Sequence, residues 1–269
     1  MVDLSAAYEG VEGVANFPTE EALRNYRAMA LERSVQQADF IGRRFSGAGS
    51  VAEACCGNGR LLIALADRMQ RLQGFDLAAS RIDFARQWVE AAGCKNVDVW
   101  RDDMLEPSRR PAPADLGICI TGAFAYFGAL SGEHERRAVA SLGAMVRPGG
   151  GLLLELYQHP ATIAHCLAEP DGRWQRWSEL AAEDPFRFSL SAFAYDRQRG
   201  VLRHEKKFIA RNGSVDEGRV EALRIYSPET LDGLLAPWFD QPEWYGDWAG
   251  NAFAPDSKHM IVSFRRRAD

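Results

Sequence analysis

Two glycines and a carboxylate stand close together in the stretch Val-Ala-Glu-Ala-Cys-Cys-Gly-Asn-Gly-Arg, residues 51–60. Gly57 and Gly59 permit backbone angles that other residues avoid, so a ligand can lie directly against the main chain. Glu53 places a negative charge at the mouth of this loop, which suits a cationic ligand and would repel a pyrophosphate. Residues 51–60 therefore predict a binding loop for a ligand that carries positive charge.

Other chemistries fit the same loop less well. The dinucleotide motif Gly-x-Gly-x-x-Gly needs a third glycine where Leu62 stands, and the Walker motif needs a Gly-Lys-Ser/Thr sequence that is missing here. A nucleophilic role for Cys55 or Cys56 needs a histidine partner that the sequence does not indicate, so two small buried thiols are the simpler interpretation. The cysteine and histidine spacings match no metal motif, and we expect no protein-bound metal.

Two further acidic residues follow later predicted strands. Asp76 lies at about the 20-residue distance at which a carboxylate accepts both hydroxyls of a ribose. Asp103 precedes Met104 in Arg-Asp-Asp-Met-Leu, where a carboxylate can accept from the exocyclic amine of adenine while the methionine lies against the ring. Its neighbour Asp102 is expected to be exposed to solvent. Three carboxylates at successive strand ends predict a pocket for a positively charged adenosine derivative.

Alternating strands and helices must position these residues. Short apolar stretches predict parallel strands, and amphipathic stretches between them predict helices, the third of them capped by Ser80. The predicted strands cover residues 50–54, 71–77, 96–100, 114–122 and 151–157, and the predicted helices cover residues 19–45, 59–69, 81–92 and 132–146. This alternation is typical of a doubly wound sheet with helices on both faces.

The pattern changes after Tyr157. Residues 158–186 are expected to be helical or irregular, and residues 187–214 to form antiparallel strands with turns at Arg199-Gly200 and Asn212-Gly213. Ser227 and Pro228 are expected to begin another helix, and two strand-like stretches close the chain. We therefore expect one domain over residues 1–269, with an N-terminal helical cap (1–47) and an insertion over the substrate site (158–225).

Taken together, the motifs resemble those of class I S-adenosylmethionine-dependent methyltransferases. Residues 51–60 resemble the family's first motif, usually an acidic residue followed by Gly-x-Gly-x-Gly, although Cys55 stands where the first glycine is expected. The later motifs are similar in residues 74–86, 101–105, 114–127 and 145–157, and more distantly in 224–235 and 245–248. The resemblance implies a Rossmann-like α/β fold with a seven-stranded, mostly parallel sheet whose last strand is antiparallel.

The resemblance also implies S-adenosylmethionine as cofactor and assigns residues to it. Glu53, Gly57 and Gly59 would line the methionine side, Asp76 would hold the ribose, and Asp103 would hold the adenine amine. Thr121 and Gly122 would lie near the sulfonium. The complete predicted cofactor set is Glu53, Cys55, Gly57, Gly59, Asp76, Leu77, Asp103, Met104 and Thr121. Cys55 is expected either to keep ordinary strand angles or to shift the loop slightly.

Methyl transfer from a sulfonium is an in-line displacement that needs alignment, exclusion of water and, for some acceptors, a base. We expect the acceptor near Phe124 and Tyr126. The candidate bases are Tyr157, His159 and His134, of which we prefer Tyr157 and His159. An arginine on the N-terminal helix, near Tyr26, is available for the methionine carboxylate. Aromatic residues beyond Tyr157 either close over the acceptor or form the core of the insertion.

Three functions remain open from the sequence. The first is a methyltransferase acting on the amine or hydroxyl of a small molecule. The second is a cyclase or lyase in which the cofactor's own amine attacks its γ-carbon and releases methylthioadenosine. The third is a catalytically silent cofactor-binding subunit. The net charge of −5 gives no basic surface for nucleic acid, no apolar run reaches a membrane span, and five irregularly spaced cysteines favour the cytoplasm. The oligomeric state is not predicted.

Overall fold

The larger of two sheets contains seven strands in the order β10-β11-β5-β4-β1-β2-β3. The computed structural model describes residues 17, 19–180 and 186–268. All neighbouring pairs from β3 to β5 are parallel, and β11 is antiparallel to both of its neighbours. The strands are β1 Ser50–Ala54, β2 Arg71–Asp76, β3 Val97–Arg101, β4 Ala114–Cys119, β5 Val146–Tyr157, β10 Phe239–Tyr245 and β11 His259–Arg266. The predicted seven-stranded topology is confirmed.

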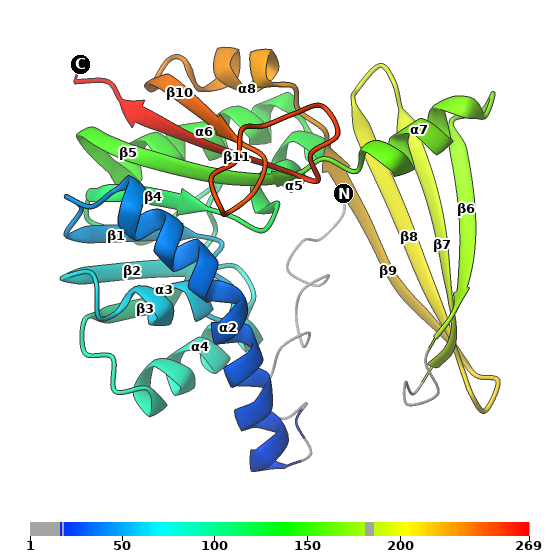
Figure 1. The fold of residues 1–269 in the computed structure, drawn as a ribbon, viewed down its shortest axis with the longest axis horizontal. Helices are drawn as coiled ribbons and strands as arrows, with labels where there is room; N and C mark the ends of the chain where they lie inside the picture. The colour runs from blue at the N-terminus through cyan, green and yellow to red at the C-terminus, as the bar shows by residue number, and fades with distance from the viewer. Residues whose placement is uncertain (1–16, 18, 181–185, 269) are drawn as a thin grey trace.

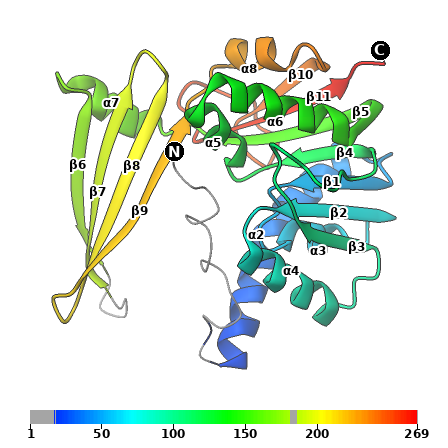
Figure 2. The ribbon, with the colours of Figure 1, turned by 180° about the vertical axis from the view of Figure 1, so that it is seen from behind.

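Helices cover both faces of this sheet (Figures 1 and 2). On one face lie α2 (Glu20–Arg44), α3 (Arg60–Leu65) and α4 (Ala79–Ala91); on the other lie α5 (Ala123–Leu130), α6 (Gly132–Met145) and α8 (Pro228–Leu235). Along β5, Leu153 packs into the first layer, whereas Leu152 and Leu154 pack into the second. Because both faces are buried, the strand is apolar at successive positions. Among the helices of the described residues, none has the length and apolar character that a membrane crossing requires.

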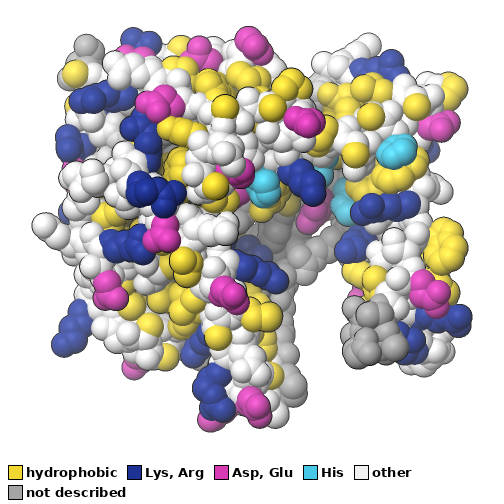
Figure 3. All heavy atoms as spheres, viewed as in Figure 1, with side chains coloured by type: hydrophobic (Ala, Val, Ile, Leu, Met, Phe, Trp, Pro, Cys, Tyr) yellow, Lys and Arg dark blue, Asp and Glu magenta, His cyan; other side chains and the backbone are white. Residues whose placement is uncertain are grey.

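A second sheet is antiparallel throughout, in the order β6-β7-β8-β9. With α7 it falls within residues 158–225, and it stands beside the carboxyl ends of the parallel strands (Figures 1 and 2). Its elements are α7 Pro160–Ala168, β6 Arg173–Glu179, β7 Phe186–Asp196, β8 Val201–Ala210 and β9 Val215–Arg224. The space-filling view shows the molecule divided in its lower half into two lobes (Figure 3).

Aromatic rings are divided between the two faces of the second sheet. His165, Trp174, Phe193 and His204 form a continuous stack with successive centroid distances of 4.3, 5.5 and 4.3 Å. Trp177, in contrast, is 68% exposed. Some of the aromatic residues of this region therefore form one local stack, and the others, such as Trp177 against Phe188, lie outside it.

A buried polar contact attaches the second sheet to the helices that cover the larger sheet. Tyr226, which follows β9, donates its hydroxyl hydrogen to Glu135 Oε1 on α6 at 2.6 Å. Arg224 Nε lies 3.4 Å from the same oxygen. Gly128 of α5 allows this close approach, because a Cβ atom there would lie only 2.2 Å from the Tyr226 hydroxyl oxygen. The end of β9 is therefore held against α5 and α6.

Two local expectations from the sequence are wrong. Helix α4 begins at Ala79 after Ala78, with no side-chain cap, so Ser80 is not its cap; the Asp76 carboxylate accepts from Ala78 N instead. Residues 173–179 form strand β6 because they pair with β7 along their whole length. Ser227 does cap α8, as predicted, and accepts from Thr230 N at 3.2 Å.

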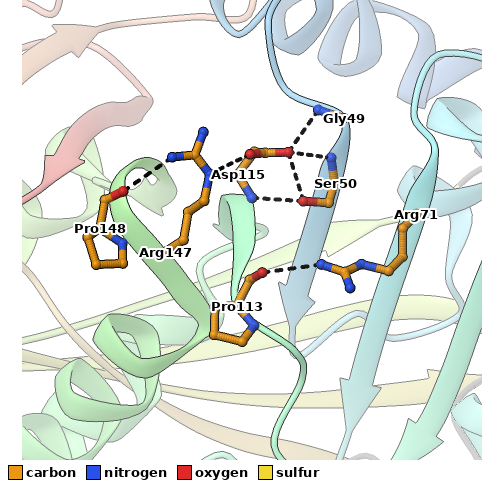
Figure 4. A network of polar contacts seen from close by, with 7 residues as sticks. All are labelled: Gly49, Ser50, Arg71, Pro113, Asp115, Arg147 and Pro148. Atoms are coloured by element: carbon orange, nitrogen blue, oxygen red, sulfur yellow. Dashed lines mark hydrogen bonds and ion pairs between the residues drawn. The ribbon is translucent and has the colours of Figure 1, made fainter.

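Asp115 ties together the beginnings of β1, β4 and β5 (Figure 4). Its carboxylate accepts from Gly49 N, Ser50 N and Ser50 Oγ at 2.8–2.9 Å, and from Arg147 Nε at 2.6 Å. The Arg147 guanidinium, followed by the Ser50 and Gly49 donors, lowers the pKa of Asp115 to about 2. The contacts therefore favour the folded state only while Asp115 is ionised.

We predict that Asp115→Asn lowers the free energy of unfolding at pH 7 by about 2 kcal/mol. This is the free energy that corresponds to the lowering of the Asp115 pKa from its unfolded to its folded value. The folded-state pKa lies below the unfolded value, so this stability is complete above pH ~4 and is lost as the pH falls toward 2. Urea unfolding between pH 2 and 7 measures the difference in stability between wild type and Asp115→Asn, and this difference should become smaller at low pH. Asp98→Asn is the control, because its ion pair with Arg109 is exposed; a loss as large as that of Asp115→Asn would contradict the account.

Candidate active site

Two adjoining cavities lie where the chain turns from β1 toward β2 on one side and from β4 toward β5 on the other. At such a switch point the loops diverge to opposite faces of the sheet, and ligands bind at the carboxyl ends of the strands. The smaller cavity has a volume of about 240 Å³ and the larger about 490 Å³. Cys55, Arg81 and Thr121 line both. A single elongated ligand could therefore occupy the two together.

Asp76 connects the loops that follow β1 and β2. It is 9% exposed and lines the smaller cavity. Its Oδ2 accepts from Gly57 N at 2.9 Å, and its Oδ1 accepts from Ala78 N at 3.0 Å. A carboxylate oxygen has more than one acceptor position, so both oxygens can still accept from a ligand hydroxyl.

The two neighbouring aspartates after β3 have different surroundings. Asp103 lines the smaller cavity beside Met104. Asp102 also lines it but is 7% exposed, and its carboxylate accepts from the backbone N–H groups of Asp103, Ser108 and Arg109 at 2.7–2.9 Å. Burial would raise the pKa of Asp102, but these donors outweigh it and lower the pKa below its usual range. The expectation that Asp102 is solvated is therefore wrong: it holds the loop that presents Asp103.

Glu53 is a buried carboxylic acid in the lining of the larger cavity. It is 3% exposed, and its Oε2 has no hydrogen-bond partner among the described residues. Burial raises the pKa of Glu53 to about 8; Arg60 opposes this increase and Asp76 adds to it. A cation that enters the cavity would therefore stabilise the ionised carboxylate.

Helix α2 covers the larger cavity from one side. Arg60 donates to Ser34 Oγ at 2.7 Å and to Gln37 Oε1 at 2.6 Å, both on α2. Tyr26 accepts from Asn58 Nδ2 at 3.1 Å. Arg33 of α2 also lines this cavity. The helix is thus fixed against the glycine loop and brings positive charge to the cavity.

Left-handed backbone angles occur where three strands end. Cys55 (φ 56°), Thr121 (φ 59°) and His159 (φ 54°) follow β1, β4 and β5. Such angles are unfavourable for a residue with a side chain and cluster at functional sites. Of the two alternatives expected for Cys55, ordinary strand angles are excluded, since the residue adopts the conformation for which a glycine would be suited.

A buried carboxylate holds the turn after β4. Glu155 on β5 is 1% exposed, and its Oε2 accepts from Thr121 N at 2.8 Å. Its Oε1 accepts from Trp248 Nε1 at 2.9 Å and lies 3.0 Å from His259 Nδ1. Sequence reasoning missed Glu155 and His259. The available signal was a carboxylate inside the apolar strand Leu-Leu-Leu-Glu-Leu-Tyr, because a buried charge requires partners.

The remaining predicted site residues are distributed as follows. Leu77 and Tyr126 line the smaller cavity, and Gly57 and Tyr157 line the larger one. Gly59 begins α3 with φ 73°, and a Cβ atom there would lie 3.3 Å from Ala85, so it allows close packing. Phe124 is 0% exposed, packs on Tyr226 at 5.7 Å and lines neither cavity. His159 also lies outside the residues that line the two cavities.

Two substitutions at Cys55 should measure the strain of its left-handed angle. Cys55→Gly should be more stable than Cys55→Ala by about 1 kcal/mol, because both variants lack the thiol and only glycine tolerates this angle freely. Cys56 has no positive φ, so at this position the order should reverse, with alanine more stable than glycine by about 0.5–1 kcal/mol. Chemical unfolding of the four variants tests both orders; equal stability of the two Cys55 variants would show that the angle is not strained.

Residues 51–150 match the family model described as a methyltransferase domain. No curated protein sequence matches the chain. Among solved structures, the CcbJ methyltransferase from Streptomyces caelestis is similar with a TM-score of 0.70 and 16% identity, over 87% of this chain and 90% of that one.

Two further structures have higher sequence identity. CalS10 from Micromonospora echinaspora, an amino pentose methyltransferase solved with S-adenosylmethionine bound, has a TM-score of 0.64 at 21% identity, covering 92% of this chain and 97% of its own. The sugar N-methyltransferase KedS8 from a Streptoalloteichus species has a TM-score of 0.62 at 21% identity, covering 95% and 96%. At these identities the structural likeness establishes the fold. The family match therefore identifies residues 51–150 as a methyltransferase domain, and the chain has the fold of the class I S-adenosylmethionine-dependent methyltransferases.

Proposed function

We propose that this enzyme transfers the methyl group of S-adenosylmethionine to an amine nitrogen of a small molecule. The observation that carries the proposal is the pair of joined cavities at the switch point, with a carboxylate at the ends of β1, β2 and β3. Adenosine would lie in the smaller cavity and methionine in the larger one, with the sulfonium near the residues that line both.

In the smaller cavity, Asp76 would accept from the ribose hydroxyls and Asp103 from the adenine amine. Leu77 and Met104 line the same cavity and would contact the faces of the adenine ring. Asp76 and Asp103 both line this cavity of about 240 Å³, and backbone N–H groups that donate to Asp76 and Asp102 fix the loops that carry them. Adenosine binding therefore requires little rearrangement of the loops.

In the larger cavity, Glu53 would bind the α-ammonium group of the cofactor. Gly57 lines this cavity, as expected for a position where a ligand lies on the backbone, and Gly59 would act indirectly by keeping the loop close to α4. Arg33 on α2 would bind the methionine carboxylate. Cys55 and Thr121, which line both cavities, would flank the sulfonium, which supplies the electrophilic methyl group when the cofactor is bound.

The acceptor would approach from the second sheet, past the ends of β4 and β5. Tyr126 and Tyr157 would contact it; burial raises the pKa of Tyr157 to about 12, so its hydroxyl stays protonated and can donate a hydrogen bond. Burial lowers the pKa of His159, which keeps its imidazole neutral. We place His159 beside the acceptor path and not in contact with the cofactor. Phe124 would support this wall from the core. In this arrangement residues 158–225 form the acceptor wall and α2, within residues 1–47, covers the cofactor.

An amine is the preferred acceptor for two reasons. CalS10 and KedS8 are described as an amino pentose methyltransferase and a sugar N-methyltransferase. The residues that line the two cavities also include more carboxylic acids (Glu53, Asp76, Asp102, Asp103 and Glu155) than arginines (Arg33, Arg60 and Arg81). Such surroundings attract an ammonium-bearing molecule more than an anionic one.

Mass spectrometry of the protein incubated with S-adenosylmethionine tests this function. Glucosamine, benzylamine and triglycine serve as amine probes, and glucose and catechol as hydroxyl probes. We expect S-adenosylhomocysteine and a methylated amine, with turnover reduced at least about tenfold at sub-saturating cofactor in Asp76→Asn, which loses a charge-assisted ribose contact. Asp67→Asn, an exposed substitution, is the control. Methylthioadenosine formed without any acceptor, or methylation of the hydroxyl probes alone, would contradict the proposal.

A further inference from the structure

A histidine–carboxylate pair lies at the edge of the larger cavity, on the side of β5 and β11. His259 opens β11 and pairs with Tyr157 of β5, so both side chains are at the carboxyl end of β5. His259 and Glu155 both line the larger cavity together with Thr121 and Tyr157. The His259 side chain is 36% exposed, whereas that of Glu155 is 2% exposed. The pair therefore has a buried carboxylate and an accessible imidazole.

The contacts of Glu155 fix which ring atom of His259 is basic. Trp248 Nε1–H and Thr121 N–H can only donate, and both donate to Glu155, which must accept from each. The Nδ1 atom of His259, 3.0 Å from Glu155 Oε1, donates to the same carboxylate. In the neutral imidazole Nδ1 then carries the hydrogen, and Nε2 keeps the lone pair. A carboxylate that orients a histidine in this way also stabilises the charged imidazolium.

We propose that His259, oriented by Glu155, accepts the proton that the acceptor ammonium group must lose before it can be methylated; this role rests on the methyl-transfer function proposed above. His259 Nε2 takes one proton from the ammonium, leaving a neutral amine with a lone pair. That lone pair forms the bond to the methyl carbon while the sulfur–methyl bond breaks and its electron pair stays on sulfur. The products are a methylated ammonium, neutral S-adenosylhomocysteine and the imidazolium of His259, which releases its proton to solvent.

The same carboxylate connects proton transfer to the alignment of the cofactor. Glu155 Oε2 holds Thr121 in its left-handed turn, and Thr121 lines the region shared by both cavities. One buried group therefore positions the base with one oxygen and the turn near the sulfonium with the other. Glu155 is a positioning residue in this account, and His259 is the group that touches the acceptor.

The charges around His259 favour its protonated form. The hydrogen bond to Glu155 on β5 is the main cause that raises the pKa of His259; burial opposes it, Lys258 just before β11 lowers it, and Asp247 in the preceding loop raises it. Tyr157 packs edge-on against the imidazole, with ring centroids 5.3 Å apart. A base whose pKa lies near the working pH is the most effective proton acceptor.

His159 is less suited to the role. It lies outside the residues that line the two cavities, and its Nε2 is buried without a hydrogen-bond partner among the described residues. Burial lowers its pKa, so it binds a proton less readily than His259 does. No carboxylate contact is observed for His159 among the described side chains, whereas His259 has one.

The test compares wild type with His259→Gln, which keeps a side chain able to donate to Glu155 but cannot take up a proton. The probe is whichever of glucosamine, benzylamine or triglycine wild type methylates fastest. We expect kcat/KM for the amine to fall about 100-fold at neutral pH, the contribution of a positioned base. The fall of kcat/KM at acidic pH, which protonation of His259 sets in wild type, should move to higher pH and follow the pKa of the free amine, because the variant can use only amine that is already neutral. Added imidazole should partly restore the rate to His259→Ala. Sinefungin, a cofactor analogue, should bind both forms with affinities within about twofold.

Three controls separate the outcomes. His134→Gln, whose imidazole contacts Ser131 outside both cavities, should leave kinetics unchanged. Glu155→Gln should move the acidic limb to lower pH, because the imidazolium loses its counter-charge. His159→Gln should keep the fall of kcat/KM at acidic pH at the same pH as in wild type. The inference is overturned if His259→Gln weakens sinefungin binding without changing kcat, or if the fall at acidic pH moves to higher pH with His159→Gln instead of His259→Gln. Wild type that methylates none of the amines would refute the proposed function itself, and the inference with it.

Discussion

Buried carboxylates that accept from backbone N–H groups give the active-site edge of this sheet its shape. Asp76 accepts from Gly57 N in the loop after β1, and Glu155 accepts from Thr121 N in the turn after β4. A buried charge without such donors would be strongly unfavourable. The turns therefore stabilise the carboxylates, and the carboxylates hold the turns in conformations that include unfavourable left-handed angles. The cavities at the switch point have their shape before a ligand binds.

The fold and the adenosine side of the site could be predicted from local sequence. Periodic apolar stretches locate each strand of the larger sheet, and the distance from the glycine loop to Asp76 reflects a single strand–helix–strand unit. Asp76, Leu77, Asp103 and Met104 all line the smaller cavity. These residues follow directly after strands, so their position is determined by short-range chain geometry. The roles assigned to them remain proposals, supported by that placement.

The acceptor side depends on contacts between distant parts of the chain and could not be predicted in the same way. Glu155 and His259 are 104 residues apart and meet only because β11 inserts antiparallel to β5. Residues 173–179 contain charged and aromatic residues without a clear period, and they become a strand because β7 is available to pair with them. Phe124 was expected at the acceptor, yet the helix α5 turns it into the core.

The central claim is that the methionine end of the cofactor lies on Glu53. Glu53 has a pKa of about 8 in the structure, so at pH 6.5 it is mostly protonated and must lose its proton to bind the α-ammonium group. Calorimetric titration with S-adenosylmethionine at pH 6.5, in buffers of different ionisation enthalpy, measures this directly. The account predicts release of about one proton per cofactor by wild type and none by Glu53→Gln, with weaker binding in the variant. Tight binding with no proton release, or equal release by both forms, would contradict it.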